Sequence, residues 1–345
     1  MLPHALLLLD DQTRSVGLAT AIADYAANYT IDSDSAIQTA RHCLIDALGR
    51  GLEALRDPLC AALIGPLVPG AVMPGGARLP GTSLELDPAQ AAFCATLTLC
   101  RPASASAWLS SLNGCAADTF GAILTIADYQ ARKAVMEGTA PVKVRDVLAA
   151  IVKALEIQGL LTHGTTGKSS VGDTSMRAAR VAAAAIVTAR LGGTQARIVT
   201  AVSYACMEGT MLLDAVERPE IARTDLSRAE SIGRAVRYAC QAMAAGRSSY
   251  LTPGDLRALD LTVDTIEIEP AGSGKPFRTG IIDRLGHDRT AQEVAELTMS
   301  FQATVDRYFP ARQAERIKAL FAAPERLDDL PVNELLAALV TNGAR

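Results

Sequence analysis

The sequence predicts a mostly α-helical protein. Of its 345 residues, 49% are hydrophobic but only 4% are aromatic, and alanine and leucine supply most of the apolar side chains. This composition favours helices that pack closely on small side chains. Apolar residues also recur at helical spacing along most of the chain. Residues 261–270 (LTVDTIEIEP) differ, because their β-branched residues and partial alternation predict one short strand.

The first amphipathic helix is predicted to begin at Ser33 or Asp34, either of which can cap its first turn. Its apolar positions keep helical spacing as far as Leu55. Residues 65–88 then contain too many glycines and prolines for a helix to persist. We therefore expect an irregular connector there.

The second helix is predicted to start at Asp87 and Pro88, a capping residue followed by a proline suited to the first turn, and to end at Cys100. Near the carboxyl end, Pro310 and Pro331 each suit the start of a further helix. Between these regions, helical patterns fall at about 117–133, 143–161, 174–191, 195–208 and 227–245. The sequence thus predicts a bundle of many helices.

Charge and hydropathy exclude some classes of partner. Lys and Arg number 33 against 37 Asp and Glu, giving a net charge of −4 without a long basic run, so nucleic acid is not expected as a partner. No stretch approaches the ~20 apolar residues of a membrane span, and the first residues, MLPHALLLLDD, lack the basic flank of a signal peptide. We expect a cytoplasmic protein without a membrane partner.

The cysteines lie in apolar segments, without CxxC pairs or histidines at metal-ligand spacing. They are predicted to be buried thiols in a reducing compartment, with no metal site. The seven positions are Cys43, Cys60, Cys94, Cys100, Cys115, Cys206 and Cys240.

Residues 163–170 (HGTTGKSS) superficially suggest a phosphate-binding loop. Gly167, Lys168 and Ser169 fit the second half of a GxxxxGK[ST] motif, but the first glycine would have to stand at Thr162. The preceding segment also has helical rather than strand periodicity. We expect a glycine-rich turn between two helices, with Lys168 in solvent.

Several phrases together resemble the MmgE/PrpD family, which includes 2-methylcitrate dehydratases and cis-aconitate decarboxylases, and the likeness is greatest to the former. The phrases run collinearly over nearly the whole chain. They are HCLIDALGRGLEAL (42–55), IGPLVPGAVMPGGARLPGTSLELDPAQAAF (64–93), GAILTIADY (121–129), APVKVRDVLAAIVKALEIQG (140–159), GRAVRYA (233–239), LGHDR (285–289), FPARQAERI (309–317) and LPVNELLAAL (330–339).

The resemblance implies a large all-helical domain with a smaller α+β lid domain inserted before the last helices. It also implies a homodimer that uses no metal or organic cofactor. In this chain the LGHDR segment follows the helical part almost at once, so most of the lid is expected to be missing. The implied division is a helical domain of residues 1–250 and 281–345, with 251–280 as the remnant of the lid.

The family's chemical positions, carried over by the resemblance, have mostly lost their polar groups. When the motif WLDFNDTW is aligned on Trp108, its acidic residues correspond to Ala103 and Ser106 and its asparagine to Ala105. The histidine of the following GHPSDN motif corresponds to Cys115, and Asp118 alone keeps its identity there.

Two further motifs are changed in the same way. Ser175 stands where the family has a histidine after VGLD, and Thr224 aligns near the lysine of RKSWAAGD, in a register left uncertain by a one-residue length difference. Dehydration of a citrate needs a base, an acid and cations or amides that hold carboxylates. We therefore expect the fold to be retained and the dehydratase chemistry to be lost.

The remaining candidates for catalysis each have a structural alternative. Cys115 could be a nucleophile or a small buried filler, and His163 a base or an exposed loop residue. Lys168 lies beside His163 in the rebuilt loop. Asp118 could anchor a ligand or cap the helix through Ile123. Glu156, which matches the family phrase EIQG, is expected to form an interhelical hydrogen bond.

Two classes of function remain open, together with a third that is disfavoured. The first is an enzyme that cyclises, isomerises or eliminates a bulkier and less charged small molecule than a tricarboxylate. Its pocket would be lined by Ala103, Ala105, Ser106, Trp108, Cys115, Ser175 and Thr224. The second is a non-catalytic paralogue that binds an active dehydratase-like subunit, and the third is a dehydratase with relocated catalytic residues.

Overall fold

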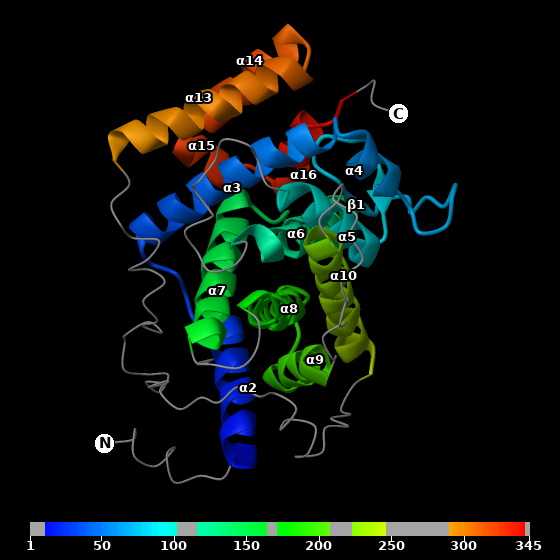
Figure 1. The fold of residues 1–345 in the computed structure, drawn as a ribbon, viewed down its shortest axis with the longest axis vertical. Coiled ribbons are helices and arrows are strands. Elements are labelled where there is room, and N and C mark those ends of the chain that lie inside the picture. The colour runs from blue at the N-terminus through cyan, green and yellow to red at the C-terminus, as the bar shows by residue number, and fades with distance from the viewer. Residues whose placement is uncertain (1–10, 102–115, 164–170, 208–222, 246–289, 342–345) are drawn as a thin grey trace.

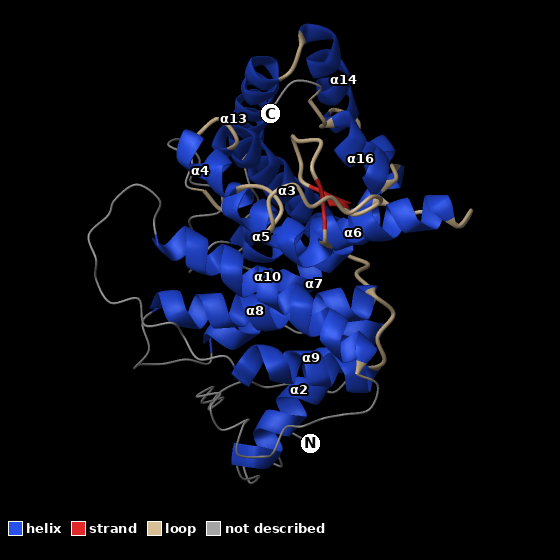
Figure 2. Cartoon of the chain, turned by 90° about the vertical axis from the view of Figure 1, so that its right-hand side faces the viewer, coloured by secondary structure: helices blue, strands red, loops and turns tan. Residues whose placement is uncertain are grey.

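Helices account for most of the residues that the structure describes. The computed structural model describes residues 11–101, 116–163, 171–207, 223–245 and 290–341. In these ranges the chain is mostly α-helical, as the sequence predicts, and Figure 2 shows two very short strands as the exception. The predicted strand at 261–270 lies outside the described residues.

The amino-terminal half contains α2 to α6. The elements are α2 (Asp11–Asn28), α3 (Asp34–Ala54), α4 (Pro58–Leu63), β1 (Ala77–Arg78), β2 (Glu85–Leu86), α5 (Pro88–Leu99), the 3-10 helix η1 (Ala116–Thr119) and α6 (Phe120–Met136). The predicted caps are confirmed: Ser33 Oγ accepts a hydrogen bond from Ala36 N, and Asp87 Oδ1 accepts from Ala89 N and Gln90 N.

The second half continues the bundle. Its elements are α7 (Val144–His163), α8 (Val171–Arg190), α9 (Gln195–Met207), α10 (Arg223–Ala244), α13 (Ala291–Tyr308), α14 (Ala311–Phe321), α15 (Pro324–Asp329) and α16 (Val332–Ala338). Pro310 and Pro331 occupy the N-cap positions of α14 and α16, as predicted. A capping box between Thr290 and Glu293 starts α13.

Helix α8 lies at the centre of the bundle. It packs against α7, α9 and α10, and α5 packs between α6 and α10 (Figure 1). Small side chains permit this, because the run Ala182–Ala185 of α8 is completely buried. Glycines bring α5 close to its neighbours: a Cβ on Gly233 would lie 3.2 Å from Ala89 O, and one on Gly121 only 2.4 Å from Thr96 Oγ1.

The connector is more structured than the sequence predicts. β1 and β2 form a two-stranded antiparallel ribbon within it. The ribbon is fixed to α6 because Asp128, which is fully buried, accepts hydrogen bonds from Arg78 N and from Arg78 Nη2, each at 2.9 Å. Just before the connector, Asp57 caps the short helix α4.

The carboxyl-terminal helices return to the amino-terminal body. Figure 1 shows α13 alongside α3 and α14 next to α13, and α16 packs against α6. Thr304 Oγ1 donates to Glu53 Oε1 at 3.0 Å across the α3–α13 contact. The division into residues 1–250, 251–280 and 281–345 stays a prediction, because the whole middle segment lies outside the described residues.

One cysteine does not follow the prediction of burial. Cys43, Cys60, Cys94, Cys100 and Cys206 are buried, whereas Cys240 is exposed. Cys240 lies on the outer side of α10, whose buried face is formed by Ala235, Val236 and Ala239. Cys115 lies outside the described residues.

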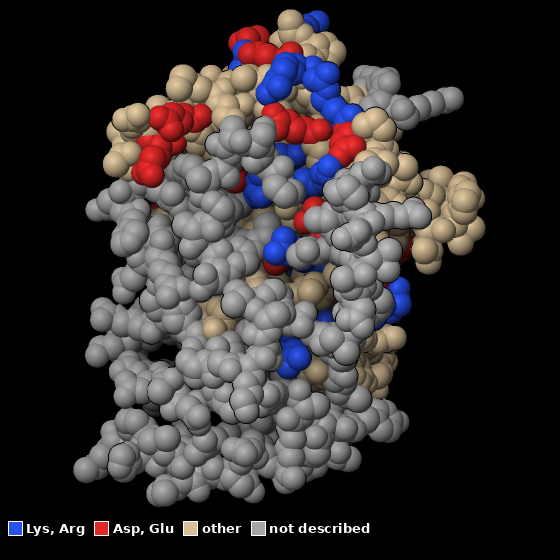
Figure 3. All heavy atoms as spheres, in the orientation of Figure 1, with Lys and Arg blue, Asp and Glu red and all other residues tan. Residues whose placement is uncertain are grey.

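The surface has no extended patch of one charge in the described part of the face drawn in Figure 3, where basic and acidic side chains are interspersed. Among the described helices, none combines the length and the hydrophobicity that a bilayer span requires. His42 is half-buried on α3.

Candidate functional site

The predicted site residues divide into described and undescribed groups. Asp118 lies in η1 and Ser175 in the second turn of α8, and both are buried. His163 ends α7 and Thr224 lies in the first turn of α10, but their side chains are outside the described part of the structure. Ala103, Ala105, Ser106, Trp108, Cys115 and Lys168 lie outside it entirely.

Asp118 is held between a thiol and a guanidinium. It is 1% exposed, Cys100 Sγ donates to its Oδ1 at 3.3 Å, and Arg228 Nε lies 3.6 Å from the same oxygen. The alternative of Asp118 as a helix cap is wrong, because Thr119 occupies the N-cap position of α6. Asp118 therefore joins the end of α5 to α10 instead of starting α6.

Arg228 is shared by two carboxylates. Besides Asp118, its Nη1 lies 3.8 Å from Asp225 Oδ1, one turn earlier on α10. Burial raises the pKa of Asp225, and the nearby guanidiniums of Arg228 and Arg101 oppose that rise. Arg101 is itself ion-paired with Asp57. The charges around η1 thus largely compensate one another.

Ser175 and Thr224 lie toward the same end of the bundle. Helices α8 and α10 run in the same direction, because Arg180 on α8 contacts Ser231 on α10, and a Cβ on Gly193 just after α8 would meet Met243 near the end of α10. Both helices also pack against η1. The starts of α8 and α10 and the Asp118 segment therefore lie in one region of the bundle.

A buried arginine lies between these helices. Arg180 is 5% exposed, and its Nε donates to Ala205 O at 2.8 Å while its Nη1 donates to Ser231 Oγ at 3.3 Å. Burial lowers the pKa of Arg180. Arg177, one turn earlier, has a buried Nε that makes no hydrogen bond among the described residues. Cationic groups thus accompany the start of α8.

The sequence argument misses these cations near the candidate site. It searches for acids, bases and nucleophiles at the family's positions and assigns no role to Arg177, Arg180 or Arg228. A signal is nevertheless present in the phrase MRAARVAAAAIV (176–187), where an arginine occurs among small residues at a position of the buried helical face. Buried arginines are rare unless they are paired or hydrogen-bonded.

The buried groups near the bundle core are poorly suited to act as nucleophiles. Burial raises the pKa of Cys60 to about 11 and that of Cys206 to about 12, so both thiols stay protonated at neutral pH. Glu156 is 2% exposed, and its Oε2 makes no hydrogen bond among the described residues, contrary to the expected interhelical bond for that oxygen. Burial raises the pKa of Glu156 to about 8.

Asp118 is expected to contribute to stability as well as to the shape of the site. Asp118→Asn keeps an acceptor for Cys100 but removes the charge that faces Arg228. Because Arg228 is partly exposed and keeps Asp225, we expect a loss of about 2 kcal/mol in the free energy of unfolding by urea, below the range for a fully buried pair.

Asp306→Asn is the matched control, since Asp306 pairs with Lys318 at an exposed position. That change should cost less than about 0.5 kcal/mol. Equal losses in the two variants would show that the Asp118–Arg228 pair contributes no more to the free energy of unfolding than an exposed ion pair does.

Comparison with known proteins places the fold and this site in context. Residues 20–254 match the MmgE/PrpD N-terminal domain. The 2-methylcitrate dehydratase of Escherichia coli K12 is 40% identical over 222 residues, which cover 64% of this chain and 46% of that protein.

Two fungal proteins show the same relationship. The mitochondrial 2-methylcitrate dehydratase of Yarrowia lipolytica is 37% identical over 221 residues, 63% of this chain and 42% of that protein. The 2-methylcitrate dehydratase-like protein oryR of Aspergillus oryzae is 36% identical over 192 residues, 54% of this chain and 38% of that protein. The chain thus spans less than half of the length of these relatives.

The matched region contains α3 to α10 and every site residue discussed above. The predicted family is therefore confirmed: the chain belongs to the MmgE/PrpD family and is related to the 2-methylcitrate dehydratases.

Proposed function

We propose that this protein has lost 2-methylcitrate dehydratase chemistry and acts as a cofactor-independent cyclase, isomerase or lyase on a larger and less charged metabolite. The observation that carries the proposal is the state of Asp118, the one chemical position that keeps its polar residue. Its carboxylate is buried against Cys100 and Arg228, where it can fix the shape of a site but is poorly placed to remove a proton from a ligand.

The charge balance at η1 also supports a less charged ligand. A tricarboxylate needs several unneutralised cations or amides. Here Arg228 already faces Asp118 and Asp225, and Arg180 already donates to Ala205 O and Ser231 Oγ. Among the described residues at this site, only Arg177 keeps a buried N–H without a partner, so a molecule with at most one anionic group fits better than a tricarboxylate.

Catalysis without a strong acid or base remains substantial when a site holds its substrate in a reactive conformation. Orientation alone contributes roughly 7–11 kcal/mol in favourable intramolecular reactions. Cyclisation and isomerisation of a preformed intermediate depend on such orientation more than the dehydration of a citrate does. We assign the shaping of the pocket to Ser175 and Thr224, at the starts of α8 and α10, with the Trp108 segment.

The loss of dehydratase activity can be measured directly. Purified protein incubated with 2-methylcitrate or with citrate is expected to produce no unsaturated acid, followed by its ultraviolet absorbance, because the acid, base and carboxylate-binding groups together supply at least roughly 10⁴-fold in rate. A bacterial 2-methylcitrate dehydratase assayed in parallel is the positive control. Clear turnover by this chain would refute the proposal.

A second candidate, a non-catalytic paralogue bound to an active dehydratase-like subunit, has one observation in its favour. The connector carries exposed apolar side chains, Leu67 at 78%, Val68 at 64% and Val72 at 70%. Met136 at the end of α6 is 69% exposed and lies against Gly75 of the connector. Exposed apolar residues grouped in this way are typical of protein interfaces.

Mixing this chain with a purified 2-methylcitrate dehydratase separates the two candidates. A stable complex on size-exclusion chromatography that Val72→Ser abolishes would favour the paralogue. A homodimer of this chain alone, also implied by the resemblance, would appear in the same experiment. The cytoplasmic location stays a prediction.

A further inference from the structure

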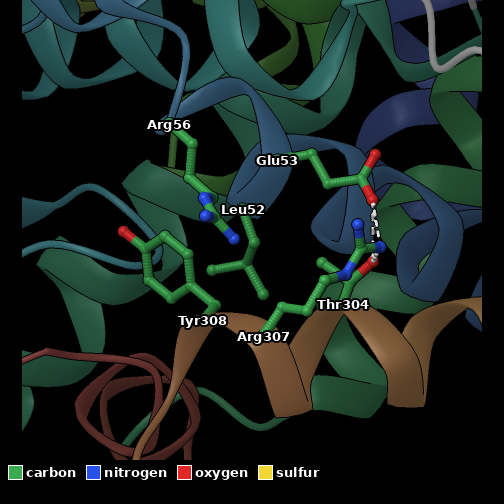
Figure 4. A pocket seen from close by; sticks show the side chains of 6 residues that line it. All are labelled: Leu52, Glu53, Arg56, Thr304, Arg307 and Tyr308. Atoms are coloured by element: carbon green, nitrogen blue, oxygen red, sulfur yellow. Dashed lines mark hydrogen bonds and ion pairs between the residues drawn. The ribbon is translucent and has the colours of Figure 1, made fainter.

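A pocket far from Asp118 lies where α13 packs on the end of α3. Its volume is about 370 Å³, and Figure 4 shows the side chains that line it. They are Leu52, Glu53 and Arg56 from the end of α3 and Thr304, Arg307 and Tyr308 from the end of α13. The pocket therefore lies between the amino-terminal body and a helix that follows some 250 positions later in the sequence.

Hydrogen bonds connect several of the side chains that line the pocket. Glu53 Oε1 accepts from Thr304 Oγ1 at 3.0 Å and from Arg307 Nη2 at 2.9 Å. Tyr308 Oη donates to Gly81 O at 3.1 Å. These bonds orient Arg307 and the Tyr308 hydroxyl, although the Arg307 side chain is 61% exposed.

On the Tyr308 side of the pocket in Figure 4 lies a cation that has no counter-ion among the described residues. Arg56 is exposed and forms no ion pair or side-chain hydrogen bond among the described residues. In Figure 4 its side chain lies beside Leu52, apart from the Glu53–Arg307 pair. Two guanidiniums and one carboxylate line the pocket, so its lining has one net positive charge.

We propose that this pocket binds a small oxyanion, a carboxylate or a phosphate, between Arg56 and Arg307. A guanidinium presents several N–H groups in a plane that matches two oxygens of such an anion. Arg307 uses Nη2 for Glu53 and Nε for Ala303 O, which leaves Nη1 for a ligand. The half-buried Tyr308 ring offers an apolar surface for the rest of the molecule.

Binding would link α3 to α13 and thereby stabilise the attachment of the carboxyl-terminal helices. The competing explanation is that Arg56 and Arg307 only balance the negative ends of the α3 and α13 dipoles, since both arginines stand at helix carboxyl termini. The two explanations differ in one respect: a dipole contribution does not depend on the anion concentration at constant ionic strength.

The test is thermal unfolding of the full chain titrated with inorganic phosphate or with malonate, at an ionic strength held constant with KCl. The expected result is a saturable rise in Tm with half of the effect at roughly 1–10 mM anion. Phosphate acting at lower concentration than malonate would identify a phosphate site, and the reverse order a carboxylate site.

Arg56→Gln should weaken the anion effect at least about tenfold, and Arg307→Gln should weaken it too. Arg316→Gln, which changes an exposed arginine of α14 away from the pocket, should leave the anion effect unchanged. An Arg56→Gln protein whose Tm is lower by the same amount with and without phosphate would overturn the proposal. So would an effect of phosphate no larger than that of KCl.

Discussion

Glu156→Gln is expected to make the protein about 4 to 5 kcal/mol more stable than the wild type at pH 9, while the two proteins are nearly equal at pH 4. The carboxyl group of Glu156 is 2% exposed, its Oε2 makes no hydrogen bond among the described residues, and burial raises its pKa from 4.5 to about 8. Each unit of pKa shift corresponds to about 1.4 kcal/mol, so this shift lowers the free energy of unfolding by about 4 to 5 kcal/mol once both states are ionised.

The direction of the pH dependence follows from proton binding. Below pH 4.5 Glu156 is protonated in both the native and the unfolded chain, so it adds no pH dependence. Between pH 4.5 and 8 the native state retains a proton that the unfolded state has released, and the free energy of unfolding therefore falls as the pH rises. Above pH 8 both states are ionised, and the loss is constant.

Glutamine has nearly the same shape as glutamic acid but cannot ionise, so the variant removes this contribution alone. Urea unfolding of both proteins at pH 5, 6.5, 8 and 9 measures it as a difference that grows with pH. Glu137→Gln is the control, because Glu137 is exposed beside Lys133 at the end of α6. A constant difference between wild type and Glu156→Gln across this pH range would contradict the assignment.

Local signals account for the parts of the fold that the sequence predicts well. Ser33 and Asp87 cap helices because each has a short polar side chain and directly precedes a run with helical spacing, and Pro310 and Pro331 fix the backbone angle that a helix start requires. The connector ribbon is different. Its strands depend on Arg78 reaching Asp128 of α6, a contact between distant residues that no local pattern encodes.

The candidate site shows the same division. The resemblance places Asp118 and Ser175 in one region, and the packing of η1 on α8 agrees. The sequence could not tell that Asp118 contacts Arg228 instead of capping α6, because both arrangements suit an aspartate before an apolar run. It also could not tell that Glu156 Oε2 lacks a hydrogen bond, since burial depends on the neighbouring helices.

Gly121→Ala is expected to destabilise the protein by about 3 kcal/mol. A Cβ at this position would lie 2.4 Å from Thr96 Oγ1, 2.7 Å from Thr96 N and 3.1 Å from Ala92 O. Two of these atoms belong to the backbone of α5 and cannot move aside by a change of rotamer. Helices α5 and α6 would have to separate, and overpacking of a core typically costs 1–3 kcal/mol or more.

The site should respond as well, because Gly121 lies in the first turn of α6, directly after the η1 segment that carries Asp118. A displacement of α6 from α5 moves Asp118 away from Cys100, which is the C-cap residue of α5. We therefore expect Gly121→Ala to weaken both folding and the binding of any ligand at the starts of α8 and α10.

Gly49→Ala separates steric crowding by the added Cβ from the effect of helix propensity. Gly49 also lies within a helix, but a Cβ there would meet only Phe301 Cδ2, at an ordinary contact distance of 3.5 Å. Because alanine favours a helix over glycine, this control should be neutral or more stable by about 0.5–1 kcal/mol. Urea unfolding measures the change in the free energy of unfolding for both variants. If the two changes are equal, then the close approach of α5 and α6 does not depend on Gly121.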